Sequence, residues 1–460
     1  MTPMGASSPT EAEPDPKTLA TGIAAALTSS GVVGLAVTLV DNSGVARVKA
    51  IPVTRLAEAV AKGIGAPPVF DAFGFDGSIA SVGSPVGDLR LVPDLSAVVP
   101  LGGQSGWAWA PADRVAVDGT PYLGCQRTFA RRMADRAANS GLQVRMAFET
   151  EWVVDAGSGD ELVPATTGPV YGMGRLVDLS GYVRDLLDAF AAEGVDVEQI
   201  HPEYAPSQME VSVSALDPVG AADRAVLVRQ TLRAVSANFV YRVSLSPAVV
   251  ADGVGSGAHV HLSVWDGDDN VLARRDGGLR ADGEAWLAGI LDAMPALLAV
   301  GAPSVASYLR LRPQRWAAPW RCWGRENREA ALRLIDGSAS TAGAAANAEV
   351  KVFDASANPY LVVGALIAAG LDGVERGLQL PPEATTDPAG MDDAARARAG
   401  ITRLPTSLSA ALDAFDANPV LGVAMGPALA GTWSAVRRDE VDRFADATDE
   451  DVVLACRWVW

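Results

Sequence analysis

The spacing of apolar and polar residues along the chain predicts strands where the period is two and helices where it is close to 3.6. Helical spacing is found over residues 16–29, 125–140, 176–193, 218–240, 283–300 and 359–377. Strand spacing is found over residues 32–40, 44–52, 144–153, 209–214, 259–264, 331–335 and 348–353. Residues 437–460 are expected to form a charged amphipathic helix with an apolar end from residue 452, and such an end favours docking onto another element or subunit.

The order of these segments divides the chain into a tail and two units. Residues 1–16 are rich in Pro, Ser, Thr and Glu and are expected to be disordered. Residues 17–118 combine a hairpin signal at Asp41-Asn-Ser-Gly44 with many glycines and prolines, which predicts a small β unit rich in turns. Residues 119–460 alternate long helices with strands and are predicted to form the second, larger domain.

Carboxylates gather on one face of two of the predicted strands. A period of two places Glu149 and Glu151 on the same face of their strand, and Glu203 and Glu210 flank a turn built on Pro206-Ser207. Two carboxylates roughly 6 Å apart repel by about 2 to 3 kcal/mol at an effective dielectric constant near 20. Several such groups on neighbouring strands therefore predict a site that binds cations.

The histidines of the chain fall in the same segments. His201 lies beside Glu203, and the strand over 259–264 places His259, His261 and Ser263 on one face. The same period places Glu349 and Lys351 together on a further strand. If these faces line one cavity, the set is rich in oxygen ligands and suits Mg²⁺ or Mn²⁺ better than Zn²⁺.

Arginines follow the predicted cation site along the chain. Arg310 lies after a long helix, Arg328 precedes a predicted strand, and Arg333 lies within that strand. Guanidinium groups near divalent cations and a glycine turn are what phosphoryl transfer from a nucleotide requires. The sequence therefore predicts phosphoryl transfer from a nucleotide.

Charge and cysteine content exclude several classes of protein. The formal net charge of -18 argues against nucleic acid and anionic membranes as partners, because both need a basic surface. The three cysteines, Cys125, Cys322 and Cys456, are far apart, which disfavours a disulfide framework. No signal peptide and no apolar run of membrane-spanning length is expected, so the sequence predicts a cytoplasmic enzyme.

Motifs along nearly the whole chain resemble the glutamine synthetase superfamily of the prokaryotic type. The segments that carry the resemblance are Phe75-Asp-Gly-Ser78, Glu149-x-Glu151, Glu203 with Glu210, Gly255-Ser-Gly-Ala-His259, Asn327-Arg328 to Arg333, and Glu349 to Asn358-Pro-Tyr360. The resemblance implies an α+β fold, with a β-grasp domain over 17–118 and a catalytic antiparallel β half-barrel surrounded by helices over 119–460. It also implies a homo-oligomeric ring, a hexamer or dodecamer, with active sites between neighbouring subunits.

The resemblance also implies roles for individual residues. Glu151, Glu203 and Glu210 would hold one metal ion, and Glu149, His259 and Glu349 the other. The residues implied to bind the nucleotide are Glu198, His261, Ser263, Arg328 and Arg333. Those implied to bind glutamate are Gly255, Arg310 and Lys351. Those implied to take part in catalysis are Asp76, Arg310, Arg328 and Trp316.

Two departures from the family pattern concern the site for ammonium. Trp316 stands where true glutamine synthetases have an acidic residue, and Ile79 stands where they have a serine near Asp76. A less polar pocket favours a longer amine, so the chain is closest in character to the glutamate–amine ligases of polyamines or ethanolamine, enzymes of nitrogen metabolism. Glutamine synthetase using ammonia and a non-catalytic structural or regulatory ring are the alternatives. For Trp316 the alternative is packing against Pro313 and Pro319.

Overall fold

The computed structural model describes residues 15–273, 278–337, 343 and 345–460. The predicted disordered tail therefore lies outside the described residues, except for its last two. Asp15 caps helix α1 (Pro16–Ser29) by accepting a hydrogen bond from the backbone N–H of Thr18, and Pro16 is the first residue of that helix.

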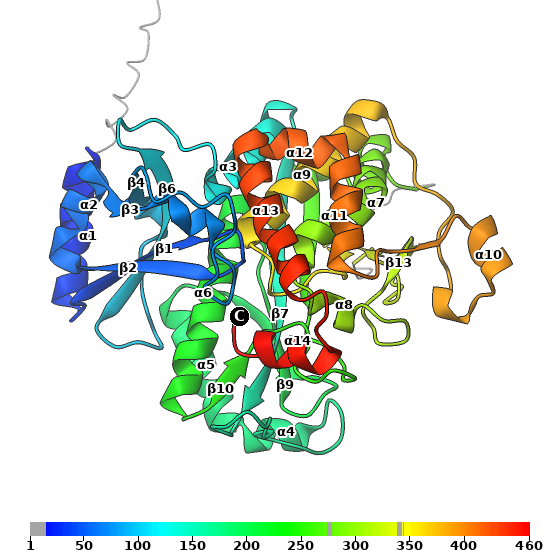
Figure 1. Cartoon of the computed structure of the whole chain (residues 1–460), viewed down its shortest axis with the longest axis horizontal. Helices are drawn as coiled ribbons and strands as arrows, with labels where there is room; N and C mark the ends of the chain where they lie inside the picture. Colours follow the sequence, from blue (N-terminus) through cyan, green and yellow to red (C-terminus); the bar gives the residue numbers. More distant parts are fainter. Residues whose placement is uncertain (1–14, 274–277, 338–342, 344) are drawn as a thin grey trace, which may run out of the picture.

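The N-terminal part of the chain forms a six-stranded sheet with α1 and α2 (Leu56–Lys62) beside it, coloured blue to cyan in Figure 1. Its strands are β1 (Gly34–Val40), β2 (Ala46–Pro52), β3 (Ile64–Ala66), β4 (Leu89–Pro93), β5 (Val99–Pro100) and β6 (Trp107–Ala116). Short 3₁₀ turns span Val53–Arg55, Pro68–Ala72 and Leu95–Ala97. The predicted hairpin is confirmed, because β1 pairs antiparallel with β2, while on its other side β1 pairs parallel with β6.

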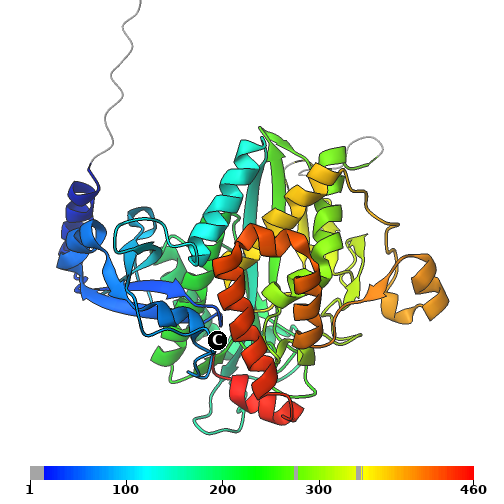
Figure 2. The same ribbon diagram turned by 45° about the horizontal axis from the view of Figure 1, so that its top comes forward.

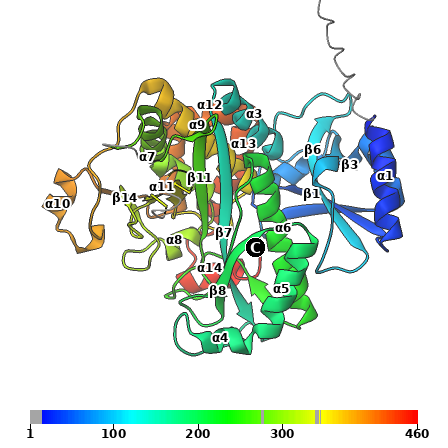
Figure 3. The same ribbon diagram turned by 180° about the vertical axis from the view of Figure 1, so that it is seen from behind.

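The rest of the chain is built on a nine-stranded curved sheet in which the long strands β7 and β11 run side by side through the middle of the molecule (Figure 3). Its strands are β7 (Gln143–Asp155), β8 (Val197–Pro202), β9 (Gln208–Val213), β10 (Arg242–Ser244), β11 (Ala258–Asp266), β12 (Asp269–Asn270), β14 (Trp323–Arg325), β15 (Leu332–Ile335) and β16 (Asn347–Val350). All pairs are antiparallel except β14 with β15, which is parallel, so the sheet is of the antiparallel kind that was expected. The strands β13 (Trp320–Arg321) and β17 (Thr402–Arg403) form a separate pair.

Helices cover this sheet and confirm the α+β class. They are α3 (Gln126–Asn139), α4 (Met173–Asp178), α5 (Ser180–Ala192), α6 (Pro218–Asn238), α7 (Ala281–Gly301), α8 (Ser307–Arg310), α9 (Pro359–Arg376), α10 (Asp393–Arg398), α11 (Leu408–Ala417), α12 (Pro419–Met425), α13 (Pro427–Arg443) and α14 (Asp449–Cys456), with a 3₁₀ turn at Pro388–Gly390. The helix predicted over 176–193 is two helices, α4 and α5, which meet at Leu179. Figure 2 shows α10 standing apart from the body of the molecule.

Helix α7 corrects the expectation that no apolar segment is long enough to cross a membrane. Among the described residues it is the one helix that is long and apolar enough to cross a membrane, and 83% of its most apolar stretch is buried. Helices α12 and α13 are also long and apolar enough when they are taken together, but the pair is bent by 114°. Glycines bring α7 against α9, since a Cβ on Gly289 would lie 2.2 Å from the carbonyl oxygen of Ala369. Its burial is that of a core helix.

The end of the chain differs from its prediction in two ways. The expected single helix is broken between α13 and α14, because Thr448 and Asp451 form a capping box that starts a new helix. The apolar end docks on its own chain, where the indole N–H of Trp460 donates to the Ser43 carbonyl at 3.1 Å and the Leu245 N–H donates to the Trp460 carbonyl at 2.9 Å. The end therefore lies at the junction with the small sheet (Figure 1), and it gives no support to assembly.

Candidate active site

The register of the large sheet sets the polar residues of neighbouring strands directly opposite one another. The facing pairs are His259 and Glu149, Glu151 and Glu210, His261 and Glu349, Arg333 and Glu349, and His201 and Glu210. The alternate residues Phe148, Trp152 and Val260 are buried in the core, as the period of two predicts. One face of the sheet therefore gathers carboxylates and imidazoles from β8, β9, β7, β11 and β16.

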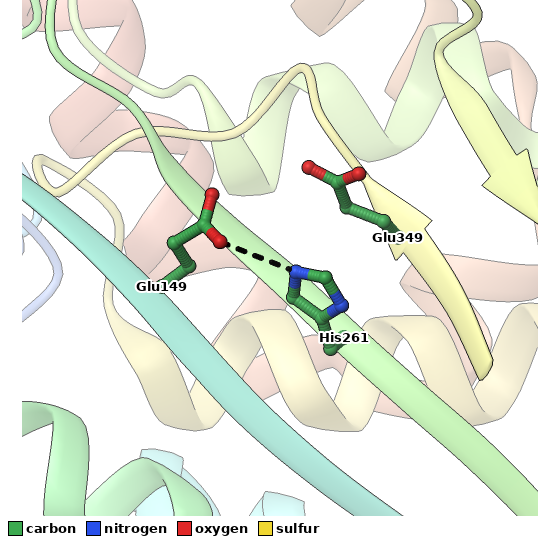
Figure 4. A group of neighbouring side chains, drawn as sticks. All are labelled: Glu149, His261 and Glu349. Atoms are coloured by element: carbon green, nitrogen blue, oxygen red, sulfur yellow. Dashed lines mark ion pairs between the residues drawn. The ribbon is translucent and has the colours of Figure 1, made fainter. Parts of the chain in front are cut away.

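A first group that could hold a metal ion consists of Glu149, His261 and Glu349, whose ligand atoms lie within 4.8 Å of one another (Figure 4). Nε2 of His261 is buried, has no hydrogen-bond partner among the described residues, and lies 3.7 Å from Oε2 of Glu149. The histidine expected here, His259, is also close, with Nδ1 2.7 Å from Glu149 and 3.3 Å from Glu349. Both imidazoles are therefore placed to act as ligands.

A second group consists of His201, Glu203 and Glu210, again with ligand atoms within 4.8 Å of one another. Nε2 of His201 lies 3.1 Å from Glu210, and its Nδ1 lies 3.7 Å from Glu203. Glu151, expected in this group, accepts hydrogen bonds from the Gln208 side chain at 2.8 Å and from the Gly257 N–H at 3.0 Å. Its other oxygen lies 3.7 Å from Nε2 of His259, so Glu151 stands between the two groups.

The electrostatics of these groups favour added positive charge. The hydrogen bond to Glu210 raises the pKa of His201 to about 9. Burial and Lys351 lower the pKa of His259, but the carboxylates of Glu149 and Glu349 outweigh them and raise it to about 9. Burial, with the nearby carboxylates, raises the pKa of Glu210 to about 7. Oxygen and imidazole donors that retain protons so readily fit divalent cations, which would supply the missing charge.

The residues expected to bind glutamate lie against the first group. Arg310 is buried, its guanidinium lies 3.1 Å from Nε2 of His259, and it donates to the carbonyl oxygens of Lys351 and Phe353 at 3.0 and 3.3 Å. A Cβ on Gly255 would lie 2.7 Å from Arg310, so this close approach needs glycine. The ammonium group of Lys351 lies 2.9 Å from Glu349.

The residues expected to bind the nucleotide are spread along the strands. Arg333 bridges Glu349 at 3.0 Å and Glu326 at 2.5 Å, whereas Arg328 is exposed in the turn between β14 and β15 and forms no ion pair among the described residues. Ser263 accepts a hydrogen bond from the Trp265 indole at 2.9 Å. Glu198, exposed on β8, accepts one from Ser214 at 2.6 Å. Of this set, only Arg333 and His261 contact the carboxylate groups.

Comparison with known proteins agrees with this geometry. The family described as "Glutamine synthetase, catalytic domain" matches residues 123–453. The chain belongs to the glutamine synthetase family. It is 50% identical over 447 residues to "Gamma-glutamylpolyamine synthetase GlnA3" of Streptomyces coelicolor, covering 95% of this chain and 96% of that protein.

More distant members of the glutamine synthetase family also match along most of the chain. The match to a glutamine synthetase of Halobacterium salinarum is 29% identical and spans 92% of this chain and 93% of that protein. A crystal structure described as a novel glutamine synthase homolog superposes with a TM-score of 0.82 at 31% identity, covering 92% of this chain and 97% of that one. The family resemblance expected from the sequence is therefore confirmed.

Trp316, expected at the family's acidic position, lies in a strained loop beside the second group. Gln314, Trp316 and Ala318 all have positive φ, at 58°, 55° and 51°, a conformation that costs of order 1 to 3 kcal/mol per residue. The Trp316 ring lies 4.6 Å from that of Tyr204, the residue after Glu203, and Trp316 is 47% exposed. The Trp316 ring therefore packs against Tyr204, which is next to the candidate metal ligand Glu203.

Asp76 and Ile79 lie on the small sheet's side of the molecule. Asp76 forms an ion pair with Arg443 of α13 and accepts a hydrogen bond from the Ser78 N–H at 3.0 Å. Within the described part of the chain, none of its polar contacts reaches the carboxylate groups. Ile79 is 58% exposed, so both residues are open to a second molecule.

Two neighbours of the candidate ligands, Gln208 and Tyr171, were not predicted. His201 was expected in the site beside Glu203 but was not among the implied metal ligands, and it lies in the second group. Gln208 is two residues before Glu210 on β9, so the strand period places both on the same face and could have predicted Gln208 in the site. Tyr171, in a loop with no periodic pattern, lies near Glu203, and its ring lies 6.4 Å from that of His201. No sequence signal marked Tyr171.

Proposed function

We propose that this chain is an ATP-dependent ligase that joins an amine, in the first place a polyamine, to the γ-carboxylate of glutamate. The observation that carries the proposal is the meeting of two carboxylate–imidazole groups beside a buried arginine on one face of the sheet. The Streptomyces relative named a γ-glutamylpolyamine synthetase supports the choice of amine. A non-catalytic ring is disfavoured, because clustered carboxylates cost stability and give a scaffold nothing in return.

The reaction divides into two displacements. An oxygen of the glutamate γ-carboxylate bonds to the γ-phosphorus of ATP, and the bond to ADP breaks. The amine nitrogen then bonds to the acyl carbon, phosphate leaves, and the nitrogen loses a proton. Two ions of Mg²⁺ or Mn²⁺ per site, when bound, would neutralise the charge of the phosphates.

The chain's own residues would position the reactants. Arg310 would bind the carboxylate of glutamate through its guanidinium fork, since burial fixes its direction. Arg328, free of ion pairs among the described residues, would reach the phosphates of ATP. We propose that the reaction takes place in the cytoplasm. We also propose that the boundary between the small and the catalytic domain lies at residue 118.

The amine would enter beside Trp316 and Tyr204. A polyamine has methylene groups that the two rings can cover, and its charged far end is attracted by aromatic faces and by the acidic protein. Ammonium has no carbon to bury and would need more oxygen partners than this wall offers. The pair of rings therefore favours the longer amine.

Phosphate release from ATP and glutamate, measured with ammonia, ethanolamine, monoamines and polyamines, tests the choice of amine. We expect the highest kcat/KM with a polyamine. Trp316→Glu should shift the ratio of kcat/KM toward ammonia by about 10-fold or more, because a carboxylate replaces the indole. Trp316→Phe, which keeps an apolar ring, is the control and should retain the preference. Saturable use of ammonia at equal or higher kcat/KM than any amine would make the chain an ordinary glutamine synthetase.

We also propose a ring in which Asp76 completes the site of a neighbouring subunit. An inactive Asp76→Ala chain reassembled with an inactive Glu210→Ala chain should regain part of the activity, since some shared sites then receive both intact residues. Each variant reassembled with itself is the control and should stay inactive. A monomer that is fully active in solution would contradict this assembly.

A further inference from the structure

A small cavity lies at the junction of the two sheets, away from the carboxylate groups. It has a volume of about 120 Å³, room for one small anion or a few waters. It is enclosed by the β1–β2 hairpin, by α6 and by the end of the chain. Its lining residues are Val40, Gly44, Val45, Ala46, Val226, Arg229, Gln230, Arg233, Leu245, Val459 and Trp460.

Two arginines of α6 carry positive charge into this cavity without a carboxylate partner. Arg229 is only 6% exposed, donates one hydrogen bond to the Ala357 carbonyl at 3.1 Å, and leaves its buried Nε without a partner. Arg233 donates to the Val459 carbonyl at 3.1 Å. Within residues 15–273, 278–337, 343 and 345–460, neither guanidinium forms an ion pair with a carboxylate side chain.

Two other buried arginines, Arg114 and Arg127, are neutralised by carboxylates. Arg114 pairs with Asp71 at 2.5 Å, and Arg127 pairs with Asp223 at 2.8 Å. Burial lowers the pKa of Arg229 to about 10, against the attraction of Asp354, so the group is still charged at neutral pH. An unpaired buried charge costs several kcal/mol, which a bound anion would offset.

We infer that this cavity binds a small oxyanion of the size and chemistry of inorganic phosphate, held between Arg229 and Arg233. The guanidinium fork matches phosphate oxygens, and the amide of Gln230 on the same lining offers a further donor. The apolar remainder of the lining strengthens the attraction by excluding water. The inference stands apart from the proposed function.

The cavity lies where the small sheet meets the large one, so a bound anion would affect this junction. Arg229 donates to the carbonyl of Ala357 in the segment that leads into α9, where Asn358 donates to the carbonyl oxygens of Val40 and Asp41 at 3.0 and 3.1 Å. Gly44 approaches Ser356 so closely that a Cβ would lie 2.0 Å from its carbonyl oxygen. An anion between α6 and the hairpin therefore stabilises the junction of the small sheet with the large one.

Thermal unfolding of the full chain in inorganic phosphate at constant ionic strength, with chloride as the reference, tests the inference. Phosphate at about 100 times its Kd should raise Tm by about 2 °C or more. Arg233→Gln should weaken phosphate binding, measured by titration calorimetry with the nucleotide site saturated by ADP, by about 10-fold or more. Arg224→Gln, on the same helix and also bonded to a main-chain carbonyl, is the matched control and should bind as the unaltered chain does.

Two further arms complete the test. Glycerol phosphate, which is larger, should bind more weakly than free phosphate if the ligand is the small anion, and tighter binding would assign the cavity to a phosphorylated molecule instead. Arg233→Lys keeps the charge but loses the fork and should retain part of the affinity. Equal phosphate binding by the unaltered chain and Arg233→Gln, or no effect of phosphate on either, would overturn the inference.

Discussion

Glu210→Ala is expected to abolish turnover with Mg²⁺, by about 10³-fold or more in kcat, because a lost carboxylate unseats a cation that supplies several kcal/mol to phosphoryl transfer. Glu210 lies opposite Glu151 across the sheet and 3.1 Å from His201, so its removal also relieves repulsion, and the protein should still fold. Phosphate release measures the loss, and circular dichroism checks the fold. Glu151→Ala should have the same effect.

A chelator and an exposed carboxylate supply the controls for this result. Chelation of divalent cations should stop the unaltered enzyme, and added Mg²⁺ should restore it. Glu161→Ala removes an exposed carboxylate and should leave kcat unchanged. Normal turnover by Glu210→Ala and Glu151→Ala in Mg²⁺ would show that these carboxylates hold no catalytic cation.

Arg310→Lys should lower kcat/KM for glutamate by about 100-fold or more, since an incompletely paired buried charge costs about 3 kcal/mol. The guanidinium of Arg310 is held by the carbonyl oxygens of Lys351 and Phe353, and a lysine cannot make both bonds and also grip a carboxylate. Steady-state kinetics with varied glutamate at saturating ATP and amine measure the change.

Arg312→Lys is the matched control, two residues along the same segment. Arg312 is partly exposed and pairs with Asp449 at 2.9 Å, so the loss of its fork should change kcat/KM little. If Arg310→Lys kept an unchanged KM for glutamate and an unchanged kcat, Arg310 would not bind the carboxylate of the substrate.

Much of the candidate site could be predicted because its residues are marked by local periodicity. The phase of Glu149 and Glu151 along β7, and of His259 and His261 along β11, follows from the strand period alone. The close approach of Gly255 to Arg310 is likewise indicated by the short glycine motif that begins at Gly255. The family resemblance then joined these strands in one site, and the matching family and relatives confirm that membership.

Other features depended on contacts between distant segments. Tyr171 reaches Glu203 from a loop without a period, and the Trp316 ring lies on Tyr204, more than a hundred residues away. The break before α14 followed from a capping box that competed with a continuous amphipathic pattern. Docking of Trp460 on its own chain was decided by packing, because an apolar end does not say which surface covers it.

The sequence by itself determined the strand phases, the kinds of ligand and the α+β fold, because side-chain direction in a strand alternates whatever lies beside it. Only the tertiary structure decided which strands are neighbours and in which register. That choice set Glu151 opposite Glu210 and brought His261 beside Glu349. It also left Arg229 and Arg233 without a carboxylate partner among the described residues, since the pairing of buried charges depends on packing between distant segments.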